Sequence, residues 1–510
     1  MATLTFDAVI YGGTMAGIIA AKRIAMAGYT VCILEWTKFT GGLVTGGLGI
    51  PDYVGGGASS TDWGLTTAYF QRLEAFAILD GATEELYGRH PNGLIRRYIP
   101  SWAVSARDEM LEDDNITVVT DIELMAVEKD PLTKRILSVT LDDGNTYAAG
   151  QFADASYEGD LLRMAGVTMT YGREGRAAYD EYNAGVVRWN ALSNPSQRRV
   201  SARGDVWKDY TFPPTVPDGQ ADYKTQAYNF RMTLSTESDR RVFAPPPGFR
   251  REDFLDFIDE SNVRGFSTIE AITSYQSPTP FLHSTNGNDW PGKAWEYPRL
   301  RTKAERIRHT DEMFCRHAGQ YWVAQQDSAV PSDLRTSVAA HGLPAHENSV
   351  EYIGTPGWSS ALYARVCTRM IGQQVMNFND MTEPRRTQKT DPIGVIGYGV
   401  DRHSIHYYPT PEGGFMNEGG PEDVGRGYSQ VPFGSLKPVT GQCSNALALV
   451  PVSCTDIVMC SYRMEPSWMI TGDAGGLAIA EAIKRDIPVA TLSYGPLREA
   501  LQDAGAKLTP

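Results

Sequence analysis

The strongest constraint on the fold is the order of apolar and small residues across residues 6–49. An apolar segment, Phe6–Tyr11, leads into a glycine turn and then into a run of small residues typical of a buried helix. A second apolar segment, Thr30–Leu34, follows and ends in the acid Glu35. This order predicts a strand–helix–strand unit whose helix N-terminus faces the pyrophosphate of a dinucleotide.

The turn between the first strand and the helix departs from the usual glycine fingerprint. Gly12 and Gly17 occupy its first and third glycine positions, but Thr14 occupies the second. Glu35 follows Gly12 by 23 residues, near the spacing of about 20 at which an acid accepts a hydrogen bond from a ribose hydroxyl. A strand–helix–strand unit without a ligand is the alternative, and the complete motif context favours the dinucleotide.

The segment after Glu35 favours a flavin over a nicotinamide. A nicotinamide domain continues with another helix and strand, whereas this chain continues with Gly41-Gly42, Gly46-Gly47 and Gly49. Glycines allow a loop to lie flat against a large planar ligand, although a flexible surface loop has a similar composition. We therefore expect FAD as the cofactor.

Two later segments resemble elements of flavoproteins similar to glutathione reductase: a strand end that closes the first half of the nucleotide domain, and a late Gly-Asp that reaches the ribityl chain. Asp154-Ala155-Ser156 ends an apolar segment, and Gly472-Asp473 precedes a small-residue helix whose positive end can face the flavin pyrimidine ring. A simple N-cap is the alternative for Asp473. The predicted FAD contacts are Gly12, Gly13, Thr14, Met15, Ala16, Gly17, Glu35, Trp36, Gly41, Gly42, Leu43, Gly46, Gly47, Leu124, Asp154, Ala155, Ser156, Gly472, Asp473 and Gly476.

Motifs spread over nearly the whole chain carry a resemblance to a known family. They are YGGTMAG, GGLVTGGLG, DASYEGDLLRMAGV with YGREGR, AYNFRMTL, LYARVCTRMIGQQVM, GYGVDRHSIHYYP and YRMEPSWMITGDAGG. The chain resembles the FAD-dependent oxidoreductases that are often automatically labelled putative xanthan lyases. That resemblance implies an FAD-binding domain interrupted by a substrate domain and fixes no substrate. Many relatives have Gln-Ala-Ala-Gly where this chain has Asp473-Ala474-Gly475-Gly476.

The predicted fold is α/β. A Rossmann-like FAD-binding domain of the glutathione-reductase type, residues 1–170 and 437–510, is interrupted by a mixed α+β substrate or cap domain, residues 171–436. The apolar patterns predict helices over Ala68–Leu79, Ser101–Leu111, Arg301–Asp327 and Ser359–Phe378. They predict strands over Thr117–Val127, Ile136–Leu141, Asp391–Tyr408 and Tyr428–Leu436.

Composition excludes several classes of partner. The formal net charge is −14, from 47 basic and 61 acidic residues, which argues against nucleic acid and anionic membranes. Six cysteines without a Cys-x-x-Cys pair indicate reduced thiols, and the first strand leaves no room for an export signal. The apolar run Ala8–Ala21 is too short to span a bilayer. We therefore expect a cytoplasmic protein; a homo-oligomer is left open.

The expected redox chemistry belongs to the flavin, and the chain has to position the substrate. Only one dinucleotide fingerprint occurs, so a built-in NADPH domain is not expected. Electrons then come from a small organic substrate and leave to oxygen, a quinone or a carrier protein. We expect no metal, because His403 and His406 would diverge on a strand.

The segment 401–408 supplies the predicted base. Strand alternation places Asp401 and His403 on one face and His406 on the other. Oxidation of an alcohol or amine requires loss of a proton, and histidine titrates in the useful range. His403 is the predicted base, since the family pattern keeps a histidine there, and His406 is the second choice. Either histidine can instead be structural or anchor the flavin covalently.

Two pairs of charged residues complete the candidates. Arg463 can hold a substrate oxyanion or stabilise reduced flavin with Glu465 orienting it, and a buried ion pair that supports the turn is the alternative. Arg365 and Arg369 are expected at i and i+4 of a helix, where a solvated or ion-paired face is favoured over an acidic-substrate grip.

The predicted function is an FAD-dependent oxidase or dehydrogenase that transfers hydride from an alcohol, a sugar or polyol, or an amine to flavin N5. An FAD-dependent desaturase or a flavin-assisted elimination enzyme acting on a secondary metabolite is the alternative, and a flavin-binding interaction protein without turnover is a third. The chain has no Gly-x-Ser-x-Gly elbow, which counts against a literal lyase.

Overall fold

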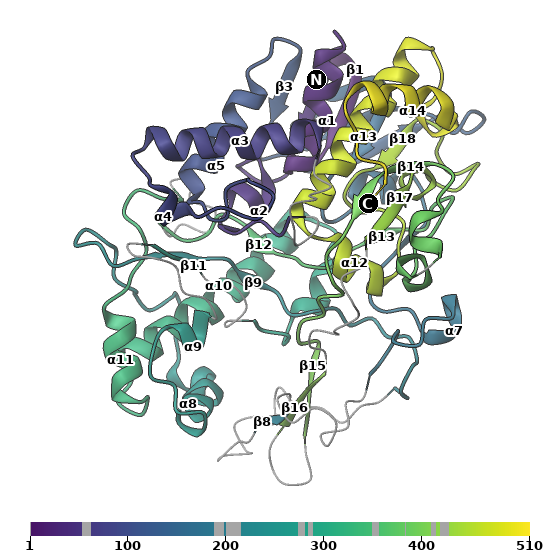
Figure 1. The fold of residues 1–510 in the computed structure, drawn as a ribbon. Coiled ribbons are helices and arrows are strands. Elements are labelled where there is room, and N and C mark those ends of the chain that lie inside the picture. The colour runs from purple at the N-terminus through teal and green to yellow at the C-terminus, as the bar shows by residue number, and fades with distance from the viewer. Residues whose placement is uncertain are drawn as a thin grey trace.

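The computed structural model describes residues 2–53, 63–187, 198–199, 216–273, 281–283, 289–348, 356–382, 384–409, 415–418 and 428–509. Figure 1 shows the N-terminal elements beside the C-terminal helices, with most of the middle of the chain on the opposite side of the molecule. Segments from both ends of the chain therefore build one part of the fold.

A seven-stranded sheet forms the centre of that part. Its strands run in the order β3-β2-β1-β6-β5-β4, and β18 also pairs with β6. β1, β2, β3, β6 and β18 run parallel, whereas β5 runs antiparallel to both of its neighbours, β6 and β4. Their bounds are β1 Thr3–Tyr11, β2 Val31–Leu34, β3 Ile116–Val119, β4 Leu124–Lys129, β5 Ile136–Leu141, β6 Thr146–Asp154 and β18 Ala446–Ala448. The predicted Rossmann-like FAD-binding fold is confirmed.

Alternate side chains of β1 pack into two different apolar cores, one on each face of the sheet. Ala8 and Ile10 pack under the helices of one face, and Val9 and Tyr11 pack into a cluster on the other face. This two-residue period is that of a strand buried on both sides. The helices of the first face are α1 Met15–Met26, α3 Gly64–Leu79, α5 Pro100–Leu111, α13 Glu465–Lys484 and α14 Tyr494–Asp503.

The close contact between α1 and α13 explains two predicted flavin contacts. A Cβ on Gly472 would lie 2.2 Å from the Ala16 carbonyl oxygen, and one on Gly476 would lie 2.7 Å from that of Ala20. These glycines therefore allow two helices to approach closely.

The predicted helix start at Asp473 is wrong, because α13 begins at Glu465. Asp473 is fully buried within the helix and pairs with Arg23. Its Oδ2 accepts a hydrogen bond from Leu65 N–H (2.8 Å), which satisfies a donor in the first turn of α3. Asp473 therefore stabilises a helix contact.

The middle of the chain has a second apolar core, which includes Phe230, Phe257, Phe314 and Tyr321. Its longest helix, α10 Lys303–Gln326, confirms the predicted helix and begins with a capping box. The other helices are α8 Leu255–Val263, α9 Glu270–Thr273 and α11 Ser332–Ala339. Antiparallel strands here are β9 Asn229–Phe230 with β12 Leu362–Tyr363, β10 Thr233–Ser235 with β11 Phe281–His283, and β15 His406–Pro409 with β16 Phe415–Glu418, which also pairs with β8 Arg198–Arg199.

The predicted helix over Ser359–Phe378 is wrong. This segment contains β12 and β13 Arg369–Met370, which pair with β9 and with β7 Met169–Thr170. A segment buried on all sides lacks the periodicity that separates helix from strand. Arg365 and Arg369 consequently share no helix face, and they pair with Asp289 and Glu174, respectively.

Three predicted strands are shorter than expected. The segment 391–408 contains β14 Pro392–Ile396 and β15, with irregular backbone at 397–405. The segment 117–127 divides into β3 and β4 at Asp121, which has a φ of 63°. The segment 428–436 contains β17 Ser429–Pro432, which pairs with β14, followed by a 3-10 turn.

The domain division stays a prediction. Ile393 and Val431 of the middle segment lie in the same core cluster as α1 and α13, so packing crosses the expected boundary. The remaining helices are α2 Gly42–Thr45, α4 Glu84–Tyr87, α6 Asp160–Met164, α7 Arg176–Tyr179 and α12 Asp456–Tyr462. Among the described helices, none is both long and apolar enough to cross a membrane.

Candidate functional site

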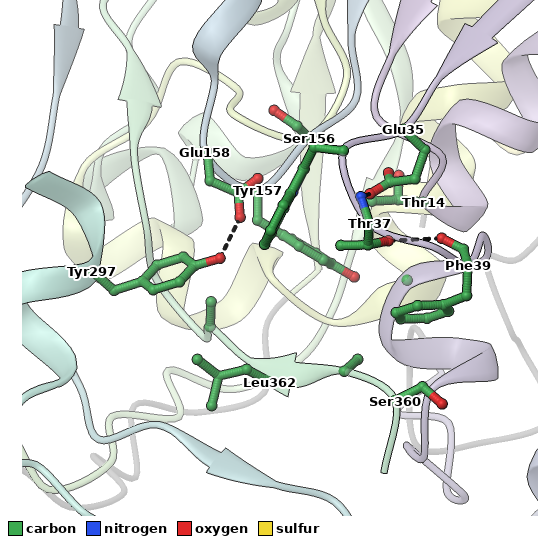
Figure 2. A pocket seen from close by; sticks show the side chains of 14 residues that line it. Thr14, Glu35, Thr37, Phe39, Ser156, Tyr157, Glu158, Tyr297, Ser360 and Leu362 are labelled. Atoms are coloured by element: carbon green, nitrogen blue, oxygen red, sulfur yellow. Dashed lines mark hydrogen bonds between the residues drawn. The ribbon is translucent and has the colours of Figure 1, made fainter. Parts of the chain in front are cut away.

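A partly open pocket lies where β1, β2 and β6 end. Figure 2 shows Thr14 and Glu35 on one side of it and Tyr297 and Leu362 on another. Open α/β sheets bind ligands at this edge. The lining residues are Thr14, Glu35, Trp36, Thr37, Phe39, Gly42, Ser156, Tyr157, Glu158, Tyr297, Ser360, Ala361, Leu362 and Ala364.

The turn after β1 presents the N-terminus of α1. Gly12 has a φ of 107°, and a Cβ there would lie 2.3 Å from Ser156 N. Thr14 Oγ1 accepts a hydrogen bond from Gly17 N–H and donates one to the Ala155 carbonyl oxygen (2.8 Å), so this residue caps the helix and ties two turns together. Helix geometry leaves the N–H groups of Met15 and Ala16 without intrahelical acceptors, which suits a pyrophosphate.

Glu35 is the buried acid of the pocket. Its Oε2 accepts a hydrogen bond from Gly13 N–H (2.6 Å), and its Oε1 accepts one from Thr37 N–H (2.8 Å). Burial raises the pKa of the Glu35 carboxyl to about 7. Trp36 follows it and shares a core cluster with Leu124.

The residues present fit the nucleotide half of FAD. A Cβ on Gly13 would lie 2.8 Å from Thr40 Cγ2, and one on Gly42 would lie 2.6 Å from the Tyr157 hydroxyl. These glycines therefore let Thr40 and Tyr157 pack close to the main chain beside Glu35 and the N-terminus of α1. Such a cradle combines the close backbone approach and the free donors that a dinucleotide requires.

The glycine segment 41–49 connects this pocket with the middle of the chain. A Cβ on Gly46 would lie 2.5 Å from Ala361 Cβ, and one on Gly47 would lie 2.3 Å from the Arg231 carbonyl oxygen. The segment therefore contacts the lining of the nucleotide pocket at Ala361 and the middle of the chain at Arg231.

Tyr157 and Glu465 meet beside the glycine segment. The Tyr157 hydroxyl accepts a hydrogen bond from Leu43 N–H (3.1 Å) and donates one to Glu465 Oε1 (2.7 Å). Glu465 is buried, its Oε2 has no partner among the described residues, and burial raises its pKa to about 8. Because α13 begins at Glu465, its positive end lies beside this segment.

Five charged residues form what we term the buried ionic network: Arg365, Asp289, His403, Asp401 and Arg463. Nδ1 of His403 lies 2.6 Å from Asp289 Oδ2, and its Nε2 lies 3.0 Å from Asp401 Oδ2. Arg365 donates to Asp289 Oδ1 (2.7 Å), and Arg463 donates to Asp401 Oδ2 (2.8 Å). An arginine therefore closes each end of a chain of hydrogen-bonded side chains.

The network keeps both carboxylates ionised. Burial opposes ionisation of Asp289, but Arg365 and His403 outweigh it and lower its pKa. Burial likewise opposes ionisation of Asp401, while His403 and Arg463 hold its pKa well below the usual range. Both ring nitrogens of His403 face carboxylate oxygens, one of Asp289 and one of Asp401. Neither nitrogen is free in this arrangement to accept a proton from a substrate.

The other predicted catalytic residues lie as follows. Arg463 contacts Asp401 and the Tyr363 hydroxyl, and Glu465 contacts Tyr157, so the expected Glu465–Arg463 pair does not form. His406 is buried at the start of β15, with its ring 5.0 Å from that of Tyr408.

Sequence reasoning missed several residues of the site. Tyr157 and Glu158 lie in the YEGD motif, Arg231 in AYNFRMTL and Tyr363 in LYARVCTRM. Motifs that carry the family resemblance thus converge on the site, and that resemblance was the available signal. Asp289 lay outside every motif. Among the described residues, no group of three or more His, Cys, Asp or Glu side chains is arranged to hold a metal.

Comparison with known proteins gave matches of differing weight. No curated protein matches the chain. Among solved structures, NikD, an unusual amino acid oxidase essential for nikkomycin biosynthesis, is 18% identical over 33% of this chain and 56% of its own, with a TM-score of 0.24. Glycine oxidase from Geobacillus kaustophilus is 16% identical over 34% and 61%, with a TM-score of 0.24. L-proline dehydrogenase from P. horikoshii is 13% identical over 34% and 59%, with a TM-score of 0.25.

These solved structures support no conclusion about the substrate, since the scores are low and the matches span little more than half of the solved chains. The sequence model of a family described as FAD dependent oxidoreductase, by contrast, matches residues 7–501. That match spans both core regions, the pocket and the buried ionic network. The chain belongs to the FAD-dependent oxidoreductase family.

Proposed function

We propose that this enzyme oxidises a small organic substrate, an alcohol, a sugar or polyol, or an amine, by hydride transfer to flavin N5. One observation carries the proposal. The glycine segment 41–49 lies between the nucleotide pocket and the middle of the chain, where Gly47 packs against Arg231. The Arg231 guanidinium lies over the same Tyr363 ring as those of Arg365 and Arg463, which belong to the buried ionic network. A flavin ring on that segment would have these charged side chains on the side away from the nucleotide pocket.

We assign the FAD contacts from the geometry of the pocket. The N-terminus of α1 receives the pyrophosphate, Glu35 accepts a ribose hydroxyl, and the glycine segment 41–49 supports the isoalloxazine. Gly472, Asp473 and Gly476 are left out, because their contacts serve helix packing. Leu124 is left out because it packs in a core cluster and does not line the pocket. The proposed contacts are Gly12, Gly13, Thr14, Met15, Ala16, Gly17, Glu35, Trp36, Gly41, Gly42, Leu43, Gly46, Gly47, Asp154, Ala155 and Ser156.

Bound FAD supplies hydride acceptance, and the chain has to manage the proton. We assign the proton to Glu465, whose carboxyl is buried and has one unpartnered oxygen. Tyr157 links this carboxyl to the glycine segment by hydrogen bonds. The ionised form of Glu465 accepts the proton that the oxidised substrate loses. His403 becomes a positioning residue that holds Asp289 and Asp401 against the two arginines.

The wider organisation follows from the same assignment. Residues 1–170 and 437–510 hold FAD, and residues 171–436 recognise the substrate. The electron acceptor is oxygen, a quinone or a carrier protein. The name xanthan lyase forms no part of the proposal.

The test is anaerobic mixing of the purified flavoprotein with panels of alcohols, polyols and amines. Bleaching of the flavin absorbance by one of these classes is expected. Glu465→Gln should slow that bleaching by roughly 10²–10⁴-fold, the usual contribution of a general base. Glu481→Gln is the control, because it changes the same group on the same helix at a partly exposed pair with Lys484. A protein that neither retains nor takes up flavin contradicts the proposal, as does equal bleaching in both variants.

A further inference from the structure

Three arginines surround one buried tyrosine at the end of β9 and β12. The guanidinium carbons of Arg365, Arg231 and Arg463 lie 4.7, 5.1 and 5.6 Å from the centre of the Tyr363 ring. All three side chains are buried, and Arg231 is the most accessible at 7% exposure. Buried like charges at this spacing repel one another unless anions compensate them.

Two of the three arginines have their compensating partners. Arg365 pairs with Asp289, and Arg463 pairs with Asp401 and donates to the Tyr363 hydroxyl (2.5 Å). Arg231 forms no salt bridge within the described part of the chain, and its Nε is buried there without a hydrogen-bond partner. One guanidinium therefore lacks an anion.

Asp52 does not supply that anion. Burial raises the pKa of the Asp52 carboxyl, and the charge of Arg231 only partly opposes that rise. The side-chain hydrogen bond of Asp52 is with Tyr398, and it forms no salt bridge with Arg231. Arg365 and Arg463 thus each have a carboxylate in contact, whereas no carboxylate contacts Arg231 in the described part of the chain. A buried guanidinium in that state favours an anionic ligand.

The position of Arg231 relates this charge to the redox site. Its carbonyl oxygen packs against Gly47 of the glycine segment, and β9, which ends next to it, pairs with β12 at Tyr363. The Nε of Arg463 is also buried without a partner among the described residues. Two guanidinium groups with unpartnered donors thus lie over one tyrosine ring, and the main chain of Arg231 packs against the segment assigned to the isoalloxazine.

We propose that the substrate carries a carboxylate, which Arg231 receives together with Arg463 beside the glycine segment. A guanidinium matches the two oxygens of a carboxylate better than any other side chain does. The inference rests on the proposed function and narrows its substrate class to carboxylate-bearing alcohols or amines. The carboxylate supplies the missing negative charge and holds the oxidisable carbon near the flavin.

Isothermal titration with benzoate and benzamide tests the charge requirement, because the two probes have similar shapes and differ in charge. Wild-type holoenzyme should bind benzoate at least tenfold more tightly than benzamide. Arg231→Gln should weaken benzoate binding by about 10–100-fold, the usual effect of losing a charged hydrogen bond, and should leave benzamide binding unchanged. Arg231→Lys should lie between the two, and Arg250→Gln, at an exposed pair, should match wild type.

Equal binding of the two probes, failure of wild type to bind benzoate, or benzoate binding by Arg231→Gln at wild-type strength would overturn the inference. If Arg231→Gln does not fold, the wild-type comparison and Arg231→Lys decide alone. Flavin content and substrate bleaching are measured separately. A chain that binds benzoate without FAD contradicts only the proposed function, and one that bleaches with substrate but ignores benzoate contradicts only this inference.

Discussion

The nucleotide pocket and the buried ionic network are built from different materials. The pocket uses main chain from consecutive segments, 11–17 and 35–47, with glycines where a Cβ would collide. The network uses charged side chains from four distant places, 289, 365, 401–403 and 463. The first is therefore sensitive to added volume and the second to lost charge, and each prediction below tests one side of that difference.

Removing Asp289 should have the largest effect. Asp289→Ala leaves Arg365, which is fully buried, and one nitrogen of His403 without their carboxylate. Breaking one member of a buried pair typically costs about 3–5 kcal/mol, because the remaining charge stays buried. Urea unfolding of the variant should show this loss of unfolding free energy. A loss below about 1 kcal/mol would show that the network is not closed in solution.

The pH dependence of the unfolding free energy should depend strongly on Glu465, which belongs neither to the nucleotide pocket nor to the buried ionic network. Its folded pKa of about 8 exceeds the ordinary 4.5, so the native state holds a proton that the unfolded state releases. The contribution of this proton to the unfolding free energy is complete below pH 4.5 and is lost as pH rises toward 8. Glu465→Gln should flatten the decline in unfolding free energy between pH 5 and 8 by about 2–4 kcal/mol.

The comparison is made on flavin-free protein by urea unfolding at several pH values. Glu35 and Asp154, whose pKa values burial raises to about 7, add to the decline in both proteins and cancel in the difference. Parallel curves for wild type and variant would show that Glu465 is not the buried, proton-bearing group described above.

Adding one methyl group between α1 and α13 should cost less. A Cβ on Gly472 would lie 2.2 Å from the Ala16 carbonyl oxygen, and overpacking of this kind costs about 1–3 kcal/mol. Gly495→Ala in α14 is the matched control, since a Cβ there meets nothing within 4 Å. Thermal unfolding should show a loss for Gly472→Ala and no loss for Gly495→Ala. Equal midpoints would contradict the close helix contact.

The smallest effect is expected at an exposed ion pair. Arg250 and Asp253 have side chains that are 68% and 48% exposed, and such pairs contribute about 0–1 kcal/mol. Arg250→Ala should therefore change the unfolding free energy by less than about 1 kcal/mol in urea. A loss comparable to that of Asp289→Ala would remove the distinction between buried and exposed charge.

The pocket was largely predictable because its signals are local. The order strand, glycine turn, helix, strand and acid places Gly12, Thr14 and Glu35 within one short segment, and local chain geometry brings them together. Asp473 shows the limit of that reasoning. A Gly-Asp pair in a small-residue helix has the same sequence pattern whether it faces a ligand or a neighbouring helix.

The ionic network was not predictable from local pattern. Arg365 lies in a segment buried on all sides, whose apolar spacing suggested a helix, and Asp289 carries no motif. Their pairing depends on long-range strand contacts such as β9 with β12. His403 was identified from the sequence, but its carboxylate partners decide whether it can act as a base. Asp401 lies in the same loop, whereas Asp289 is far away in the chain.

Flavin binding by the pocket variant Gly13→Val tests the central claim most directly. A Cβ on Gly13 would lie 2.8 Å from Thr40 Cγ2 and 3.1 Å from Glu35 Cβ, so a valine has to displace the turn and the Glu35 side chain that we assign to the nucleotide. Wild-type protein and Gly495→Ala should show flavin absorbance and release FAD on denaturation, whereas Gly13→Val should fold with little bound flavin. Full FAD occupancy in Gly13→Val, or wild-type protein that binds no FAD, would contradict the account.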